Sequence, residues 1–127
     1  HSVCVSRMVP SHLALCGLLH DAAEAYLTDL PRPIKVKLPA YQEAERHIIG
    51  ELAWKYNLPS YIPATVHDAD FVACWREAQE LGMRHPVWEQ DPKDPRSHAY
   101  TPVWILQAHW NPEKANTEFL DRFIQLA

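Results

Sequence analysis

A histidine and two acidic residues lie inside an apolar stretch near the start of the chain. His20, Asp21 and Glu24 interrupt a run of leucines and alanines between residues 13 and 27. If this run is one helix of about 3.6 residues per turn, His20 and Glu24 lie on one face, one turn apart. Burying an imidazole and a carboxylate there is costly unless they bind something. Because both groups are ligands for divalent cations, His20 and Asp21 indicate a metal site.

Two other segments contain further side chains of the same kind. His1 stands at the start of an apolar pattern, and Asp70 lies on the apolar stripe of a later helical segment. Together with His20 and Asp21 they offer two imidazoles and two carboxylates. This combination suits Co, Mn, Zn, Fe or Ni, with Mg also possible. An incomplete ligand set leaves positions for water and substrate, which indicates catalysis.

The assignment of the first and last ligands has alternatives. His67 and Asp68 compete with Asp70 as the ligand from the segment 65–81. As an alternative to metal binding, Asp68 would be an exposed residue in the first turn of a helix, where the helix dipole favours a negative charge. We prefer Asp70. His1 could also be a frayed terminal residue.

The elements that position these residues are predicted to be helices. Apolar residues recur at helical spacing, prolines separate the segments, and no stretch alternates like a β-strand. We expect helices over residues 1–9, 12–27, 40–56, 65–81, 102–110 and from 111 onward. The proline-containing segments 28–39, 57–63 and 83–97 are expected to be turns or loops. The fold class is therefore all-α, with about five to six helices around the metal site.

Size and composition limit the classes of protein to which this sequence can belong. The 127 residues fit one domain, and the net charge of −4 makes long nucleic acids unlikely partners, although a small phosphorylated ligand fits. The three cysteines form no CxxC pair, which indicates a reducing compartment. No apolar run approaches the roughly 20 residues of a membrane span. We expect a cytoplasmic protein that does not contact a membrane.

The start of the chain departs from that of a complete domain. The first residue is His1, and an apolar pattern follows at once. We therefore expect residues 1–127 to form a single domain that lacks one or more N-terminal helices.

Two short blocks resemble a known family. The sequence HDAAE at residues 20–24, followed by TDLPRPIK at residues 28–35, resembles a block in bacterial 5'-deoxynucleotidases and related phage deoxynucleoside triphosphate hydrolases. These enzymes are HD-domain metal-dependent phosphohydrolases, an all-helical superfamily named for its histidine and aspartate ligands. Segment 66–81 is similar to the helix that carries their last ligand. The resemblance covers roughly residues 1–81, although the 19 positions between His1 and His20 are a shorter spacing than this group has.

The resemblance implies a role for each candidate residue. The metal would be held by His1, His20, Asp21 and Asp70. Glu24 and Asp29 would orient and deprotonate the attacking water, and which of them is the base stays open. Lys35 would meet a phosphate. Arg32 is also placed to stabilise an anionic transition state, but for Arg32 we prefer the alternative of a solvated charge in the loop.

The function implied by the resemblance is hydrolysis of deoxynucleotides with a divalent metal. The first hypothesis is release of phosphate from deoxynucleoside 5'-monophosphates. The alternative is a dNTP triphosphohydrolase, acting for example on dATP, and a second alternative is a non-catalytic nucleotide-binding helical module. Members of the family commonly assemble as dimers or larger rings, so we also expect a homo-oligomer.

Overall fold

Helices make up the architecture of the described part of the chain. The computed structural model describes residues 1–82 and 110–127, and within these ranges it contains six α-helices, two 3₁₀ helices and no strand. The α-helices are α1 (Ser2–Met8), α2 (Ala14–Leu19), α3 (Arg32–Lys35), α4 (Pro39–Tyr56), α5 (Ala64–Glu80) and α7 (Pro112–Leu126), and the 3₁₀ helices are η1 (Ser11–Leu13) and η2 (Ala22–Ala25). The predicted all-α class is thus confirmed. The loop predicted over 83–97 and the helix predicted from Pro102 lie outside the described residues.

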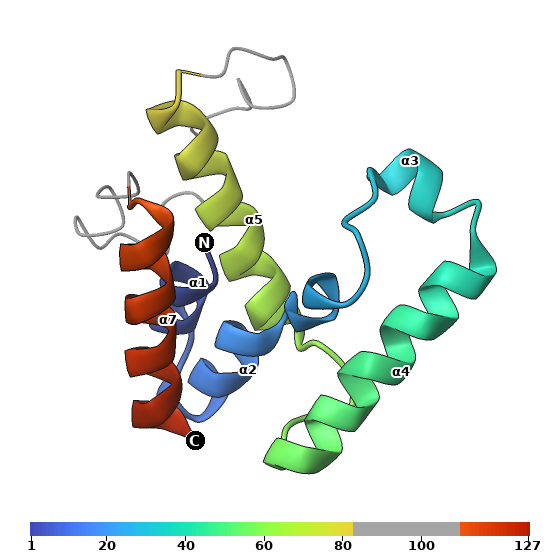
Figure 1. The fold of residues 1–127 in the computed structure, drawn as a ribbon, viewed down its shortest axis with the longest axis horizontal. Helices are drawn as coiled ribbons and strands as arrows, with labels where there is room; N and C mark the ends of the chain where they lie inside the picture. Colours follow the sequence, from blue (N-terminus) through green and yellow to red (C-terminus); the bar gives the residue numbers. More distant parts are fainter. Residues whose placement is uncertain (83–109) are drawn as a thin grey trace.

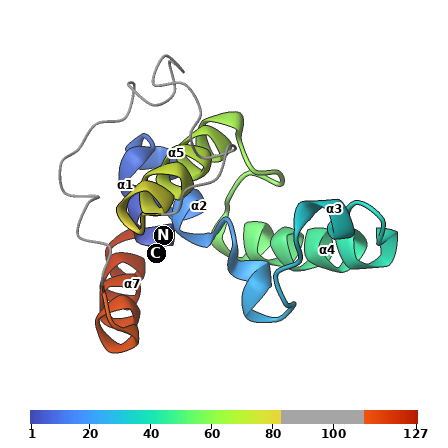
Figure 2. The same cartoon turned by 90° about the horizontal axis from the view of Figure 1, so that it is seen from above.

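The hydrophobic core lies between α1, α2 and α5. These three helices lie side by side in Figures 1 and 2. Val5 from α1 and Val66 from α5 are completely buried, and Cys16 from α2 packs into the same cluster. Small residues on α5, including Ala69 and Ala73, let the helices approach closely. Each site ligand discussed below comes from one of these helices or from its end.

The closest approach between α1 and α2 occurs at Gly17. A Cβ atom at this position would lie 3.2 Å from the Ser6 Cα atom and 3.2 Å from Val9 Cγ2. The Ser6 Cα atom belongs to the backbone and cannot move aside as the end of a flexible side chain can. A larger residue at position 17 would therefore push α1 away from α2. Glycine is therefore required here for packing.

Gly17→Ala is expected to lower the free energy of unfolding by about 1–3 kcal/mol, because the added methyl group overpacks the helix contact. Gly50→Ala is the control. Gly50 lies inside α4 with nothing within 4 Å of an added Cβ, so alanine there should raise stability by up to about 1 kcal/mol. Urea unfolding of both variants measures the two changes. Equal effects of the same sign would contradict the close approach at Gly17.

Helix α7 packs against α1 through a buried hydroxyl group. Arg122 donates from Nε to Ser6 Oγ at 2.8 Å and from Nη2 to the Ser6 carbonyl at 3.3 Å. The helix begins as predicted, since the Asn111 side chain accepts a hydrogen bond from the Lys114 amide and Pro112 occupies the first turn. Helix α7 thus packs beside α1 and α2 (Figure 1).

Helices α3 and α4 form an arm beside the core. Figures 1 and 2 show both helices on the same side of the molecule, separate from α1, α5 and α7. Three side-chain hydrogen bonds attach the segment before α4 to α4 itself. Tyr41 Oη donates to the Thr28 carbonyl at 2.5 Å, Gln42 Nε2 donates to the Lys35 carbonyl at 2.8 Å, and Lys35 Nζ donates to Glu45 at 2.8 Å. At the other end of α4, Tyr56 packs edge-on against Phe123 of α7, with ring centroids 5.5 Å apart.

The continuous helix predicted over residues 12–27 is wrong. Helix α2 ends at Leu19, His20 caps it, and the chain turns before the short 3₁₀ helix η2. Adjacent residues on a straight helix point in different directions, so a continuous helix could not direct His20 and Asp21 to the same place. The turn allows it. His20 and Glu24 consequently do not share one face of a single helix.

The described residues contain no helix that is both long enough and apolar enough to cross a membrane.

Candidate metal centre

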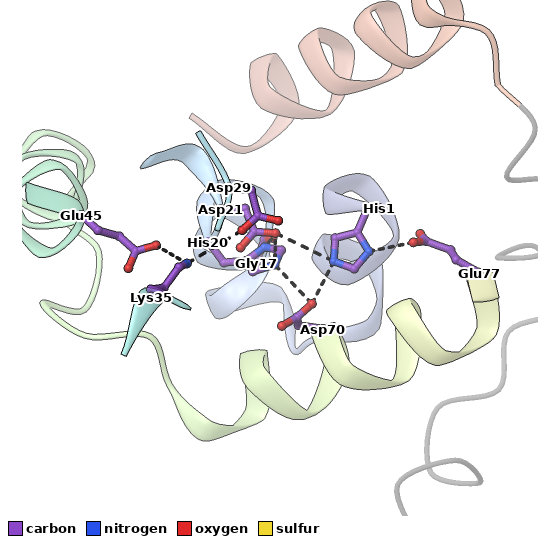
Figure 3. A network of polar contacts seen from close by, with 9 residues as sticks. All are labelled: His1, Gly17, His20, Asp21, Asp29, Lys35, Glu45, Asp70 and Glu77. Carbon is purple, nitrogen blue, oxygen red and sulfur yellow. Dashed lines mark hydrogen bonds and ion pairs between the residues drawn. The ribbon is translucent and has the colours of Figure 1, made fainter. Parts of the chain in front are cut away.

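Four side chains from three separate segments converge at the junction of α1, α2 and α5. His1 precedes α1, His20 and Asp21 follow α2, and Asp70 lies on α5 (Figure 3). One ligand atom from each lies within 4.8 Å of the others. These are the four residues predicted as metal ligands, and the structure brings them all together.

The distances within the cluster are short. His1 Nε2 lies 2.9 Å from Asp70 Oδ1, and His20 Nε2 lies 2.9 Å from Asp21 Oδ2. The cross contacts are longer, at 3.7 Å between His20 Nε2 and Asp70 Oδ1 and 4.0 Å between His1 Nε2 and Asp21 Oδ2. Both imidazoles therefore direct the same ring atom, Nε2, toward the two carboxylates.

His20 shows that the cluster fits a metal ion. Its Nδ1 donates to the Gly17 carbonyl at 2.8 Å, and because a carbonyl can only accept, this bond leaves Nε2 as the atom that can carry a free lone pair. Nε2 is buried and, within the described ranges, has no aligned hydrogen bond despite its proximity to Asp21. A buried nitrogen without a well-aligned partner, directed at two carboxylates, is the arrangement that a divalent cation satisfies.

Burial and the surrounding carboxylates act on the pKa of the histidines in opposite directions. Burial lowers the pKa of His1, but its hydrogen bonds to Asp70 and Glu77 and their negative charges raise it to about 10. Burial also lowers the pKa of His20, while Asp21 and Asp70 raise it to about 9. Protons therefore balance the carboxylates when no cation is bound. Since imidazole binds metals in its neutral form, a divalent cation would replace these protons.

Asp70 shows the opposite shift. Burial raises the pKa of its carboxyl group, but the hydrogen bond with His1 and the nearby imidazoles of His1 and His20 outweigh burial and hold the pKa well below the usual range. Asp70 is thus an anion that contacts both imidazoles, as expected of a central ligand.

The competing residues on α5 lie elsewhere. Asp68 is not part of the ligand cluster found among the described residues. His67 is exposed and lines a cleft next to the cluster without belonging to it. The geometry therefore favours Asp70 over both.

The cleft opens from the cluster toward the α3–α4 arm. Its volume is about 540 Å³. One wall contains residues of the cluster together with Glu24, and the other contains residues of α4 and of the segment between α4 and α5. The lining residues are His20, Asp21, Ala23, Glu24, Lys35, Glu45, Arg46, Ile49, Ser60, Tyr61, Ile62, His67 and Asp70.

Of the two predicted catalytic carboxylates, Glu24 lines this cleft and Asp29 lies beside the lining residue Lys35. Glu24 is exposed, and the pKa of Glu24 is raised by partial burial and by the negative charges of Asp21 and Asp29. The side chain of Asp29 is 68% exposed, and one of its oxygens lies 4.0 Å from Lys35 Nζ. The negative charge of Asp29 acts on Glu24, so the two carboxylates are close to each other.

The predicted cationic residues differ in position. Lys35 lines the cleft, where its ammonium group donates to Glu45 at 2.8 Å (Figure 3). Arg32 is exposed and does not appear among the described lining residues. Arg46, which sequence analysis does not select, lines the cleft and also pairs with Glu43 at 2.6 Å.

Sequence analysis also misses Glu77 and Glu45. Glu77 Oε2 accepts from His1 Nδ1 at 3.0 Å, and Glu45 forms the ion pair with Lys35. A signal for Glu77 exists in the sequence, since it lies seven residues, or about two helical turns, after Asp70 on the same helix. Glu45 lies in an amphipathic helix with several other acidic residues, so its spacing alone gives no such signal.

Fold and site together define an all-helical protein with a cluster of two histidines and two aspartates at the end of a cleft. The uncharacterized protein YfdR of Escherichia coli is 39% identical to the chain over 128 aligned positions, which cover 100% of this chain and 69% of YfdR. The chain belongs to the same family as YfdR.

A second relative has a named activity. The 5'-deoxynucleotidase PBPRA2627 of Photobacterium profundum is 41% identical over 54 residues, which are 42% of this chain and 27% of that protein. No family model and no solved structure matches the chain. This second similarity thus covers less than half of either protein.

Proposed function

We propose that this protein is an HD-domain phosphohydrolase that uses a divalent metal to release phosphate from deoxynucleoside 5'-monophosphates. The observation that carries the proposal is the convergence of His1, His20, Asp21 and Asp70 at the end of a cleft whose other wall contains cationic side chains. The similarity to a 5'-deoxynucleotidase over 42% of the chain supports the same class of reaction.

The four cluster residues are the proposed metal ligands. A divalent cation of the Co, Mn, Zn, Fe, Ni or Mg type lowers the pKa of water and offsets negative charge on phosphoryl oxygens. The ligands contribute two neutral imidazoles and two carboxylates, so the negative charges of the carboxylates balance the charge of the cation. Because His20, Asp21 and Asp70 also line the cleft, a cation held by the four residues would be accessible to water and substrate from the cleft.

Glu24 and Asp29 are the proposed groups that handle the water. The lone pairs of the cluster carboxylates are committed to the cation, so a separate carboxylate must take the proton. Glu24 lines the cleft and its pKa is raised, which suits the role of proton acceptor. Asp29, beside Lys35, then orients the water and is held in place by the ammonium group.

Lys35 and Arg46 are the proposed phosphate contacts. Both line the cleft, whereas Arg32 is exposed outside the described lining, so Lys35 and Arg46 are better placed than Arg32. Fixed positive charge directed at the phosphoryl oxygens stabilises the additional negative charge of the transition state. Glu45 pairs with Lys35 at 2.8 Å, so an incoming phosphate would share this ammonium group with Glu45.

A product screen tests the activity. Metal-free protein incubated with deoxynucleoside mono-, di- and triphosphates, with Co, Mn, Mg and Zn added in turn, is expected to release inorganic phosphate from the monophosphates with at least one of the metals. The matched control is the same reaction with excess chelator, which should release none. Intact triphosphate as the product would instead identify the dNTP triphosphohydrolase, and tight nucleotide binding without any product would identify the non-catalytic module.

A further inference from the structure

We infer that Glu77 is a positioning residue that orients His1 for metal binding, an inference that rests on the metal site of the proposed function. Glu77 lies on α5, the helix that also carries Asp70. Its Oε2 atom accepts from His1 Nδ1 at 3.0 Å, on the side of the imidazole ring opposite to the cluster (Figure 3). Helix α5 therefore carries both Asp70, a proposed ligand, and Glu77, which holds the proposed ligand His1.

The hydrogen bond fixes which nitrogen of His1 faces the metal. A carboxylate can only accept, so Glu77 requires the hydrogen to be on Nδ1. The lone pair of the neutral ring is then on Nε2, which lies 2.9 Å from Asp70. His20 achieves the same result through the Gly17 carbonyl. The two imidazoles thus use different acceptors for one purpose, to present Nε2 to the cluster.

His1 depends on this bond more than His20 does. His20 is held on a turn at the end of a helix and its side chain is 3% exposed. His1 precedes the first turn of α1 and its side chain is 27% exposed. Packing therefore restricts the rotation of His20, whereas a side-chain partner must restrict that of His1. A ring that rotates freely spends less time in the geometry that a metal needs.

Glu77 is otherwise costly to the fold. Its Oε1 atom is buried and has no hydrogen-bond partner in the described part of the chain. A buried carboxylate oxygen without a partner destabilises the folded state, so the contact with His1 is the interaction that accounts for an acidic residue at this position. Through His1, the negative charge of Glu77 also increases the basicity of the ligand nitrogen.

The test compares two uncharged substitutions of similar size. Glu77→Met removes the acceptor, while Glu77→Gln keeps an amide oxygen that can accept from Nδ1. The dissociation constants for Mn and Zn are measured by competition with a chromophoric chelator. Glu77→Met is expected to bind about 10–100-fold more weakly than the wild-type protein, and Glu77→Gln to recover most of the loss. Because the two variants have the same charge, their difference isolates the hydrogen bond.

Glu80→Gln is the matched control. Glu80 lies one turn further along α5, and both of its carboxylate oxygens are buried without a partner among the described residues. This variant should bind metal within about twofold of wild type, and circular dichroism confirms that each variant is folded. Equal affinity of Glu77→Met and wild type, or equal losses in Glu77→Met and Glu77→Gln, overturns the role of Glu77 alone. Absence of metal binding by the wild-type protein overturns the proposed metal site itself.

Discussion

Asp70→Ala is expected to weaken the binding of a divalent metal by more than about 100-fold. This is a larger loss than the one expected from removing a residue that only hydrogen-bonds to a ligand. Asp70 contacts both imidazoles, at 2.9 Å from His1 Nε2 and 3.7 Å from His20 Nε2. Its removal deletes one anionic ligand and leaves the other side chains without the group that holds them together. Elemental analysis of the purified variant measures the bound metal.

The neighbouring residue Asp68 provides the control for Asp70. It lies on the same helix, two positions earlier, and is not part of the cluster formed by the described residues. Asp68→Ala should therefore retain the metal content of the wild-type protein. The reverse pattern, with metal lost from Asp68→Ala and kept by Asp70→Ala, would move the ligand by two positions and contradict the geometry of the cluster.

Glu24→Ala and Asp29→Ala are expected to reduce metal-dependent phosphate release by about 100- to 10,000-fold, the contribution of a positioned general base. Glu24 lines the cleft, Asp29 lies beside Lys35, and neither belongs to the cluster found among the described residues. Their variants should therefore keep the bound metal, in contrast to Asp70→Ala. A colorimetric phosphate assay at saturating metal measures the rates, and elemental analysis measures the metal in the same samples.

Glu51→Ala is the control for the two catalytic carboxylates. Glu51 is an exposed acidic residue on α4 that does not line the cleft, so its removal changes the surface charge by the same amount and should leave the rate unchanged. Unchanged activity in both Glu24→Ala and Asp29→Ala would exclude these carboxylates from the reaction. A loss in only one of them would identify the base.

The elements with strong local signals can be predicted from the sequence. Helix α4 is predicted over 40–56 and is found at Pro39–Tyr56, because its apolar residues recur at helical spacing and prolines precede it. The start of α7 follows from the capping side chain of Asn111 and from Pro112. The preference for Asp70 over Asp68 also follows from local periodicity, since only Asp70 shares the apolar stripe of its helix.

The features that depend on tertiary contacts could not be predicted. Local sequence favours a helix through His20, Asp21 and the alanines that follow, yet the chain turns there. The turn brings two adjacent side chains to His1 and Asp70, and these contacts between distant segments outweigh helix propensity. The hydrogen bond between Glu77 and His1 joins residues that are 76 positions apart in the sequence. The spacing along α5 relates Glu77 to Asp70, but it does not indicate that His1 lies beside them.

Because Lys35 is attached to α4, a small rotation of α4 would also move Lys35. Lys35 is bound to α4 through Gln42 and Glu45, whereas the metal ligands belong to the core helices. Helix α4 contains 18 residues and is thus about 27 Å long, and the Tyr56 contact with Phe123 lies at its far end. A rotation of about 5° at that end displaces the other by about 2 Å. The separation between Lys35 and the four residues of the cluster therefore depends on the angle of this helix.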